Sequence, residues 1–170
     1  MSTISKIWMA LLVPLSMACS SSEPEKILRA PSFDGMHADL TGIDSLRYGS
    51  TYLSVYSEIY ERTQDHTHQL TCTVSMRNIS STDTCYITSS RYYSTAGTLI
   101  KAYIEQPIAL KPLETLEIII ARDDAGGGSG GNFVFEWATP SRAPSPLFEA
   151  IMISTFGQQG LSFATTGVER

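Results

Sequence analysis

The sequence predicts an all-β fold, an immunoglobulin-like β-sandwich of about seven to nine short antiparallel strands. Apolar residues recur with a period of two from Tyr52 onward. Turn-forming residues interrupt these runs at intervals of about 8–12 residues, which is typical of sandwiches. Only 17% of the residues are charged, whereas Ser, Thr and Tyr are plentiful. This composition favours strands joined by polar turns over solvated helices.

Length and charge limit the possible classes of protein. The chain has 170 residues, 42% of them apolar, which is enough for one domain with its own core. Its formal net charge of −5 offers nothing to attract nucleic acid or an anionic membrane surface. We therefore expect no nucleic-acid partner.

Residues 1–18 predict a signal peptide. Lys6 precedes an apolar run over residues 7–17, and small residues follow. The run is shorter than the roughly 20 residues that a membrane-spanning helix needs, and Pro14 interrupts it. The chain is therefore expected to be exported.

Cys19 follows Ala18 and precedes the polar tract of residues 20–25. A cysteine at this junction resembles the lipobox of bacterial lipoproteins, in which the thiol carries the lipid and becomes the N-terminus. Ser16 stands where that family usually has an aliphatic residue, so ordinary cleavage and secretion remain the alternative. We expect Cys19 to be lipidated and to attach the chain to a membrane. Because Ser20 is not the aspartate of inner-membrane retention signals, the periplasmic face of the outer membrane is the expected location.

The stretch from Cys19 to Tyr48 shows no sustained periodicity and is rich in Pro, Ser, Gly and Asp. We expect residues 19–48 to form a polar linker and residues 49–170 to form the sandwich domain. Part of the linker is apolar enough to pack on that domain, at Phe33, Leu40 and Ile43.

Strands are expected in order along the domain. Residues 70–78 alternate most clearly, with Leu70, Cys72, Val74 and Met76 on one side. The β-branched run at 116–121 fits a well-buried strand. At 148–154 a helix competes, but the flanking Pro146 and Gly157 favour a strand. The other expected strands span 52–60, 84–93, 98–103, 132–138 and 161–164.

Two cysteines remain in the domain, Cys72 and Cys85, and both fall on the apolar side of strands expected to form a hairpin. In an oxidising compartment they could form a disulfide. The hairpin turn would place Cys72 opposite a residue near position 90, so two reduced and buried cysteines are the favoured interpretation.

His66 and His68 lie on one side of an extended segment and could bind a metal ion at the surface, with His37 as a possible third ligand. Residues 64–69 equally resemble an exposed polar loop. No third ligand has a diagnostic spacing, and metal binding is therefore the alternative function.

The sequence contains no pattern typical of a catalytic centre. It has no Gly-x-Ser-x-Gly and no His-Glu-x-x-His motif. The glycine-rich run at 126–131 lacks the Lys-Ser/Thr pair or the following helix of a phosphate loop, so a flexible hairpin loop is expected. We expect no enzyme activity and no cofactor.

Five segments in this order resemble a bacterial family known as domain of unknown function 3124, a lipoprotein family. They are residues 52–60, 73–78, 86–93, 128–137 and 149–163. The resemblance implies an exported or lipid-anchored β-domain with no assigned reaction, substrate or cofactor. Neither Cys72 nor Cys85 belongs to the pattern.

Six polar positions match the family and could form a binding patch. They are Arg91, Arg122, Asp123, Asn132, Gln158 and Gln159. Turn formation and an Arg–Asp pair that ties loops to the sheet are the other explanation for them. The sequence thus favours a non-enzymatic envelope lipoprotein used for binding or assembly, with an envelope protein as a possible partner. The alternative is a periplasmic metal-binding protein that uses His66 and His68.

Overall fold

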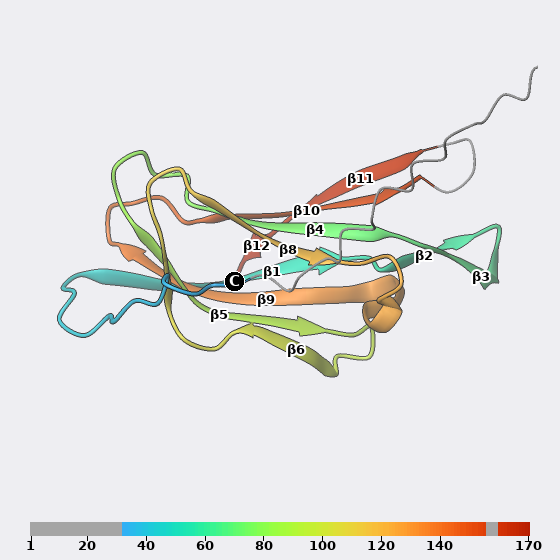
Figure 1. Cartoon of the computed structure of the whole chain (residues 1–170), viewed down its shortest axis with the longest axis horizontal. Coiled ribbons are helices and arrows are strands. Elements are labelled where there is room, and N and C mark those ends of the chain that lie inside the picture. Colours follow the sequence, from blue (N-terminus) through green and yellow to red (C-terminus); the bar gives the residue numbers. More distant parts are fainter. Residues whose placement is uncertain (1–31, 156–159) are drawn as a thin grey trace, which may run out of the picture.

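The computed structural model describes residues 32–155 and 160–170, which form an all-β sandwich of antiparallel sheets (Figure 1). The predicted fold class is confirmed. The described residues form twelve strands, more than expected, because the short strands β2, β3, β7 and β12 were not predicted as separate elements. The strands are β1 (Leu46–Val55), β2 (Glu58–Glu61), β3 (Thr63–Gln69), β4 (Thr71–Arg77), β5 (Cys85–Tyr93), β6 (Leu99–Ile104), β7 (Ile108–Leu110), β8 (Thr115–Ile120), β9 (Gly131–Pro140), β10 (Leu147–Ser154), β11 (Leu161–Thr166) and β12 (Val168–Glu169).

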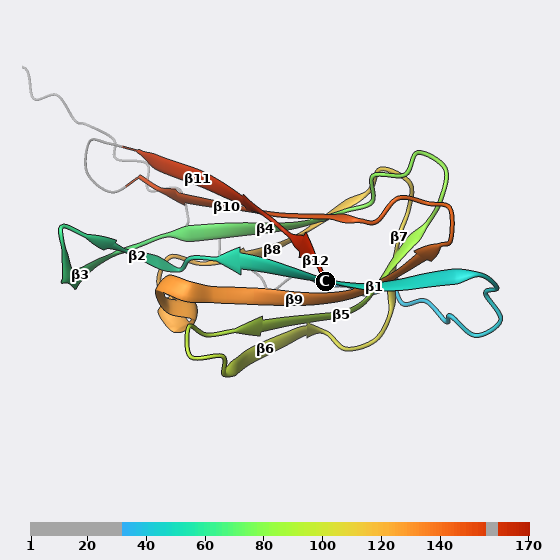
Figure 2. The same cartoon turned by 180° about the vertical axis from the view of Figure 1, so that it is seen from behind.

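Two sheets face each other across the core (Figures 1 and 2). The larger sheet has the order β12-β1-β9-β5-β6, with β7 also paired to β5. The smaller sheet has the order β11-β10-β4-β8. The β2–β3 hairpin extends beyond the end of the sandwich. Among the described residues, no helix has both the length and the apolar character needed to cross a membrane.

The core follows from the two-residue alternation. Inward residues of both sheets are almost completely buried, whereas their neighbours along the strand face outward. Aromatic rings connect the layers: the ring centroids of Phe133 and Phe135 in β9 are 5.4 Å apart, and Phe135 lies 4.2 Å from Phe148 in β10. Stacked pairs of this kind contribute about 0.5–1.5 kcal/mol each beyond the burial of their area.

The predicted hairpin between residues 70–78 and 84–93 is wrong. β4 belongs to the smaller sheet and β5 to the larger one, so the chain crosses the core between them. Asn78 holds this crossover, and it is buried. Its Nδ2 donates to the carbonyl oxygens of Leu110 and Lys111 at 3.0 and 2.9 Å, and its Oδ1 accepts from the amide of Ser80. Since Leu110 and Lys111 begin the second crossover, from β7 to β8, one side chain connects both.

Part of the expected linker packs on the domain. β1 begins at Leu46, within the stretch that showed no periodicity. Further upstream, Met36 accepts a backbone hydrogen bond from Ala109 of β7, and Ala38 donates one to Pro107. Phe33 packs against the core as expected, whereas Ile43 is 37% exposed.

Residues 64–69, expected as a polar loop, belong instead to β3 and pair with β2. Almost every residue of β3 is exposed on both faces, so no apolar alternation reveals this strand in the sequence. Backbone pairing within the hairpin is what orders it.

Gly49 of β1 lies opposite Trp137 of β9, whose indole ring occupies the space of the missing side chain. A Cβ at this position would overlap the ring. We therefore expect Gly49→Ala to lower the free energy of unfolding by about 1–3 kcal/mol in urea denaturation, as overpacked cores do. Gly160→Ala is the control, because the nearest atom to its new Cβ is 4.0 Å away. An equal effect of both substitutions would contradict this packing.

Candidate functional site

The outer face of the larger sheet carries four rows of side chains across β1, β9 and β5, which we call the tyrosine face. The strand register places these residues in line, with a bulge in β5 between Ile87 and Ser89. Two members of the rows, Ala138 and Ser89, are buried. The rows are Tyr48–Ala138–Tyr86, Ser50–Glu136–Ser89, Tyr52–Val134–Arg91 and Ser54–Asn132–Tyr93.

The tyrosine face combines exposed rings with hydrogen-bonding groups. The side chains of Tyr48 and Tyr52 are 66% and 39% exposed. Arg91 Nη1 lies 3.7 Å from Glu136 Oε1, and both of these side chains are about half exposed. Tyr and Arg are enriched at binding surfaces, and a rigid amphipathic ring offers contact area at low entropic cost. Ser and Asn supply adaptable hydrogen bonds in antibody binding sites.

A hollow of about 380 Å³ opens in this face. We call it the tyrosine hollow. It is lined by Tyr48, Gly49, Ser50, Thr88, Glu136 and Trp137. Thr88 lies at the β-bulge that shifts the register of β5 against β9. Arg170 reaches the same area, where its Nε donates to Ser50 Oγ at 3.2 Å.

The structure unites only part of the predicted patch. Arg91 and Asn132 lie in adjacent rows of the tyrosine face. Arg122 and Asp123 follow β8 of the smaller sheet, between that strand and the 3₁₀ helix η1 (Ala125–Gly130), so they belong to a different part of the sandwich. Gln158 and Gln159 lie outside the described residues.

Sequence reasoning missed the residues that line the tyrosine hollow. Tyr48 fell in the expected linker, and Glu136 was counted only as part of an alternating strand. The alternation of residues 52–60 did separate the tyrosines from Leu53 and Val55, which are buried. The neighbours across the sheet depend on strand pairing, which this pattern does not contain.

The glycine-rich segment is a packed cap, and the expectation of a hairpin is wrong, because the flanking strands β8 and β9 lie in different sheets. Its η1 turn is fixed to Thr95, whose amide and Oγ1 both donate to the Gly127 carbonyl. Gly127 lies over the hydroxyl of Tyr92, where a Cβ would overlap the phenol oxygen. Tyr92 Oη in turn is 2.9 Å from Ser57 Oγ, and burial raises the pKa of Tyr92 to about 12. The cap closes this end of the core.

His66 and His68 lie on the same side of β3, as alternation requires. His68 Nε2 is 2.7 Å from Ser154 Oγ of β10. His37 pairs with Ile108 of β7, which belongs to the larger sheet, whereas β3 pairs with β2 in a separate sheet. His37 is therefore not a neighbour of His66 and His68. In the part of the chain that the structure describes, no group of three or more His, Cys, Asp or Glu residues is placed to hold a metal ion.

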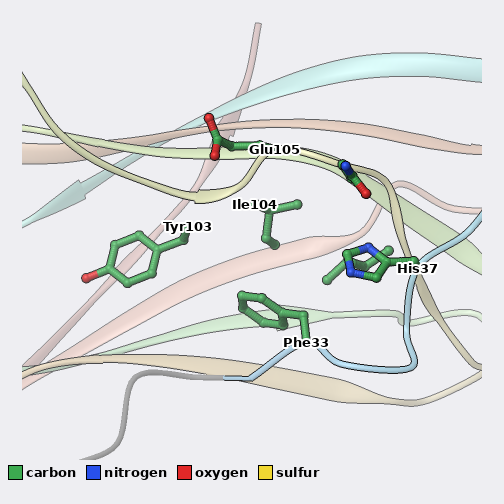
Figure 3. A pocket seen from close by; sticks show the side chains of 7 residues that line it. Phe33, His37, Tyr103, Ile104 and Glu105 are labelled. Carbon is green, nitrogen blue, oxygen red and sulfur yellow. The ribbon is translucent and has the colours of Figure 1, made fainter.

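A second hollow, the β6–β7 cavity, has a volume of about 300 Å³ and lies where the chain enters the domain (Figure 3). Ile104 and Phe33 point toward each other across it, with Tyr103 on one side and His37 on the other. It is lined by Phe33, His37, Tyr103, Ile104, Glu105, Gln106 and Ile108. Burial raises the pKa of Tyr103, which keeps its phenol neutral.

Cys72 and Cys85 are both free and buried, so the disulfide alternative does not form. They lie in strands of opposite sheets, β4 and β5, because the predicted hairpin between them is absent. Burial raises the pKa of Cys72 to about 11 and that of Cys85 to about 12. A nucleophilic cysteine needs a lowered pKa, and these two have the opposite.

Comparison with known proteins identifies one matching family and one similar solved structure. The sequence model of the family described as "Protein of unknown function (DUF3124)" matches residues 48–169. No curated protein matches the chain. The crystal structure of Thermotoga maritima 1070 is similar, with 10% sequence identity and a TM-score of 0.41 over 74% of this chain and 95% of that one. A likeness of this degree carries no argument about function.

The burial of the thiols of Cys72 and Cys85 predicts how they react with a disulfide reagent. In a Cys19→Ser chain at pH 8, we expect no rapid reaction of the native protein with a disulfide reagent, because the thiolate fraction at a pKa of about 11 is only about one-thousandth. In denaturant the same chain should release two equivalents of product, one for each of Cys72 and Cys85. Fast reaction of either cysteine in the native state would contradict the burial.

Proposed function

The chain belongs to the DUF3124 family, and we propose that it is an exported, membrane-anchored module that binds a saccharide chain in the tyrosine hollow. The observation that carries this proposal is the exposed ring of Tyr48 beside the hydrogen-bonding groups of an open hollow. The proposal assigns no reaction to the chain.

The chemistry of the hollow suits a sugar. A pyranose ring has an apolar face of C–H groups, which packs on an aromatic ring, and a rim of hydroxyls, which need both donors and acceptors. Tyr48 offers the ring, since about two-thirds of its side chain is exposed. Ser50, Thr88 and Glu136 offer the polar groups, and a few convergent polar groups in a hollow of this size are typical of a ligand site.

The charges favour a neutral ligand. Among the described residues that line the hollow, Glu136 is the only charged one, and Arg91 lies 3.7 Å from its carboxylate. Arg170 lies at the edge, where its Nε already donates to Ser50 Oγ. An ion pair that is already formed attracts neither cations nor anions strongly, but its oxygens and N–H groups still bond to hydroxyls.

The tyrosine face is longer than the hollow. Tyr52 lies four residues after Tyr48 on β1, which places a second exposed ring roughly 13 Å farther along the strand. Two rings at this separation suit several linked sugars better than a single one. Polysaccharides of the cell envelope have this form, and the signal peptide and Cys19 would place the domain beside them.

Membrane attachment is tested by labelling. In cells fed with labelled palmitate, the wild-type chain should incorporate label and sediment with membranes. Cys19→Ser removes the only thiol at the expected cleavage junction, so this variant should lose the label and move to the soluble fraction. Ser22→Ala, three residues later, should behave as the wild type. Label that persists in the Cys19→Ser chain would exclude lipidation at this position.

Saccharide binding is tested by calorimetric titration of the Cys19→Ser chain with chitotetraose, maltohexaose and soluble muropeptides. Tyr48→Ala should weaken the binding of the preferred saccharide about tenfold, equivalent to about 1.4 kcal/mol. Tyr60→Ala is the control, because Tyr60 is similarly exposed, at 61%, but belongs to the β2–β3 hairpin.

Glu136→Gln should also weaken binding, since it removes an acceptor for sugar hydroxyls. If none of these saccharides binds the parent chain, or if Tyr60→Ala has the same effect as Tyr48→Ala, the proposal is wrong.

A further inference from the structure

The β6–β7 cavity has a different chemistry from the tyrosine hollow. Two aromatic side chains, Phe33 and Tyr103, lie on its walls, and both are partly buried against the core. Ile104 and Ile108 are 3% and 1% exposed and form an apolar floor. The polar groups are at the entrance, where Glu105, Gln106 and His37 are exposed.

Of the residues that the structure describes, Glu105 is the only acidic one that lines this cavity. Among the described residues it forms no hydrogen bond or ion pair. Glu105 lines the same cavity as Phe33 and Tyr103. An unpaired carboxylate in a cavity with aromatic walls gives it a negative potential, because the faces of the rings carry partial negative charge as well.

Tyr103 already contacts a cation. The Nζ atom of Lys101 lies 4.5 Å from the centroid of the Tyr103 ring. This distance falls within the range of about 6 Å for a cation–π interaction. A ring of this cavity therefore has a face that can accept a positive charge, and Lys101 competes for it.

From the two rings, the apolar floor and the unpaired carboxylate, we propose that the β6–β7 cavity binds a small organic ammonium ion. The ammonium group lies against Phe33 and Tyr103, with Glu105 as its counter-ion, and the carbon groups contact Ile104 and Ile108. Recognition of quaternary ammonium ions by aromatic rings uses the same physics. Such ions occur as soluble compounds and as lipid headgroups. If Cys19 is lipidated, the fourteen residues from there to Phe33 extend at most about 50 Å, so a headgroup is within reach.

The test is titration of the Cys19→Ser chain with choline, followed by NMR or calorimetry. The neutral analogue 3,3-dimethyl-1-butanol has the same shape without the charge. We expect saturable choline binding in the millimolar range, as for ligands of few atoms, and at least tenfold weaker binding of the neutral analogue. Equal binding of the two compounds, or no saturable binding of choline, would overturn the proposal.

Two substitutions should change the affinity in opposite directions. Glu105→Gln removes the counter-ion and should weaken choline binding at least fivefold. Lys101→Ala removes the competing ammonium and should strengthen it. Glu58→Gln in β2 is the matched control and should have no effect. Since Lys101 and Glu105 are exposed, these variants are expected to unfold at the parent's temperature. If Glu105→Gln leaves choline binding unchanged, the assignment of the site is wrong.

Vesicles distinguish the two sources of the ligand. The Cys19→Ser chain is mixed with phosphatidylcholine vesicles, which are then floated. If the chain floats with them and the Glu105→Gln substitution abolishes this, the lipid headgroup is the ligand. Choline binding without flotation would identify a soluble ammonium compound. Both results support the ammonium site, and neither depends on saccharide binding in the tyrosine hollow.

Discussion

The apolar layer between the two sheets is the constraint on which the rest of the molecule depends. Phe135 of β9 stacks on Phe148 of β10 and on Phe133 of its own strand, so the inward side of β9 and β10 is fixed. Because successive side chains of a strand alternate, fixing the inward side also fixes the outward one. Tyr48, Glu136 and their neighbours form an ordered surface as a result. The proposed binding face is thus positioned by the same packing that stabilises the fold.

The sequence allowed the strands to be predicted but not their partners. The alternation of Leu70, Cys72, Val74 and Met76 correctly gave a buried strand, and all four side chains are fully buried. Alternation shows only that one side of a strand is apolar, and this is true of strands in both sheets. The sequence therefore could not show that β4 and β5 lie in opposite sheets, or that β1 lies beside β9. Without that pairing, the rows of the tyrosine face could not be assembled.

The other differences between the sequence-based predictions and the structure have local causes. β3 is polar on both sides, and its hairpin is held by backbone hydrogen bonds, which leave no mark on hydrophobic periodicity. The glycine-rich segment was expected to form a hairpin, but it joins strands of different sheets, and Gly127 is needed for its close approach to Tyr92. Of the six positions in the predicted patch, Arg91 and Asn132 share a face because they lie on adjacent strands, β5 and β9. Arg122 and Asp123 do not, because the chain has changed sheets before it reaches them.

The pairing of β1 has a consequence for the order of events during synthesis. Leu46 pairs with Pro140, and Tyr52 pairs with both Val134 and Val168, so the first long strand finds its neighbours only after nearly the whole chain has been made. Contacts this distant in sequence slow folding, since a long loop must close before they form. A chain with this topology stays open while the ribosome extends it. Under the proposed export, this delay would keep the chain unfolded for its passage through a translocation channel.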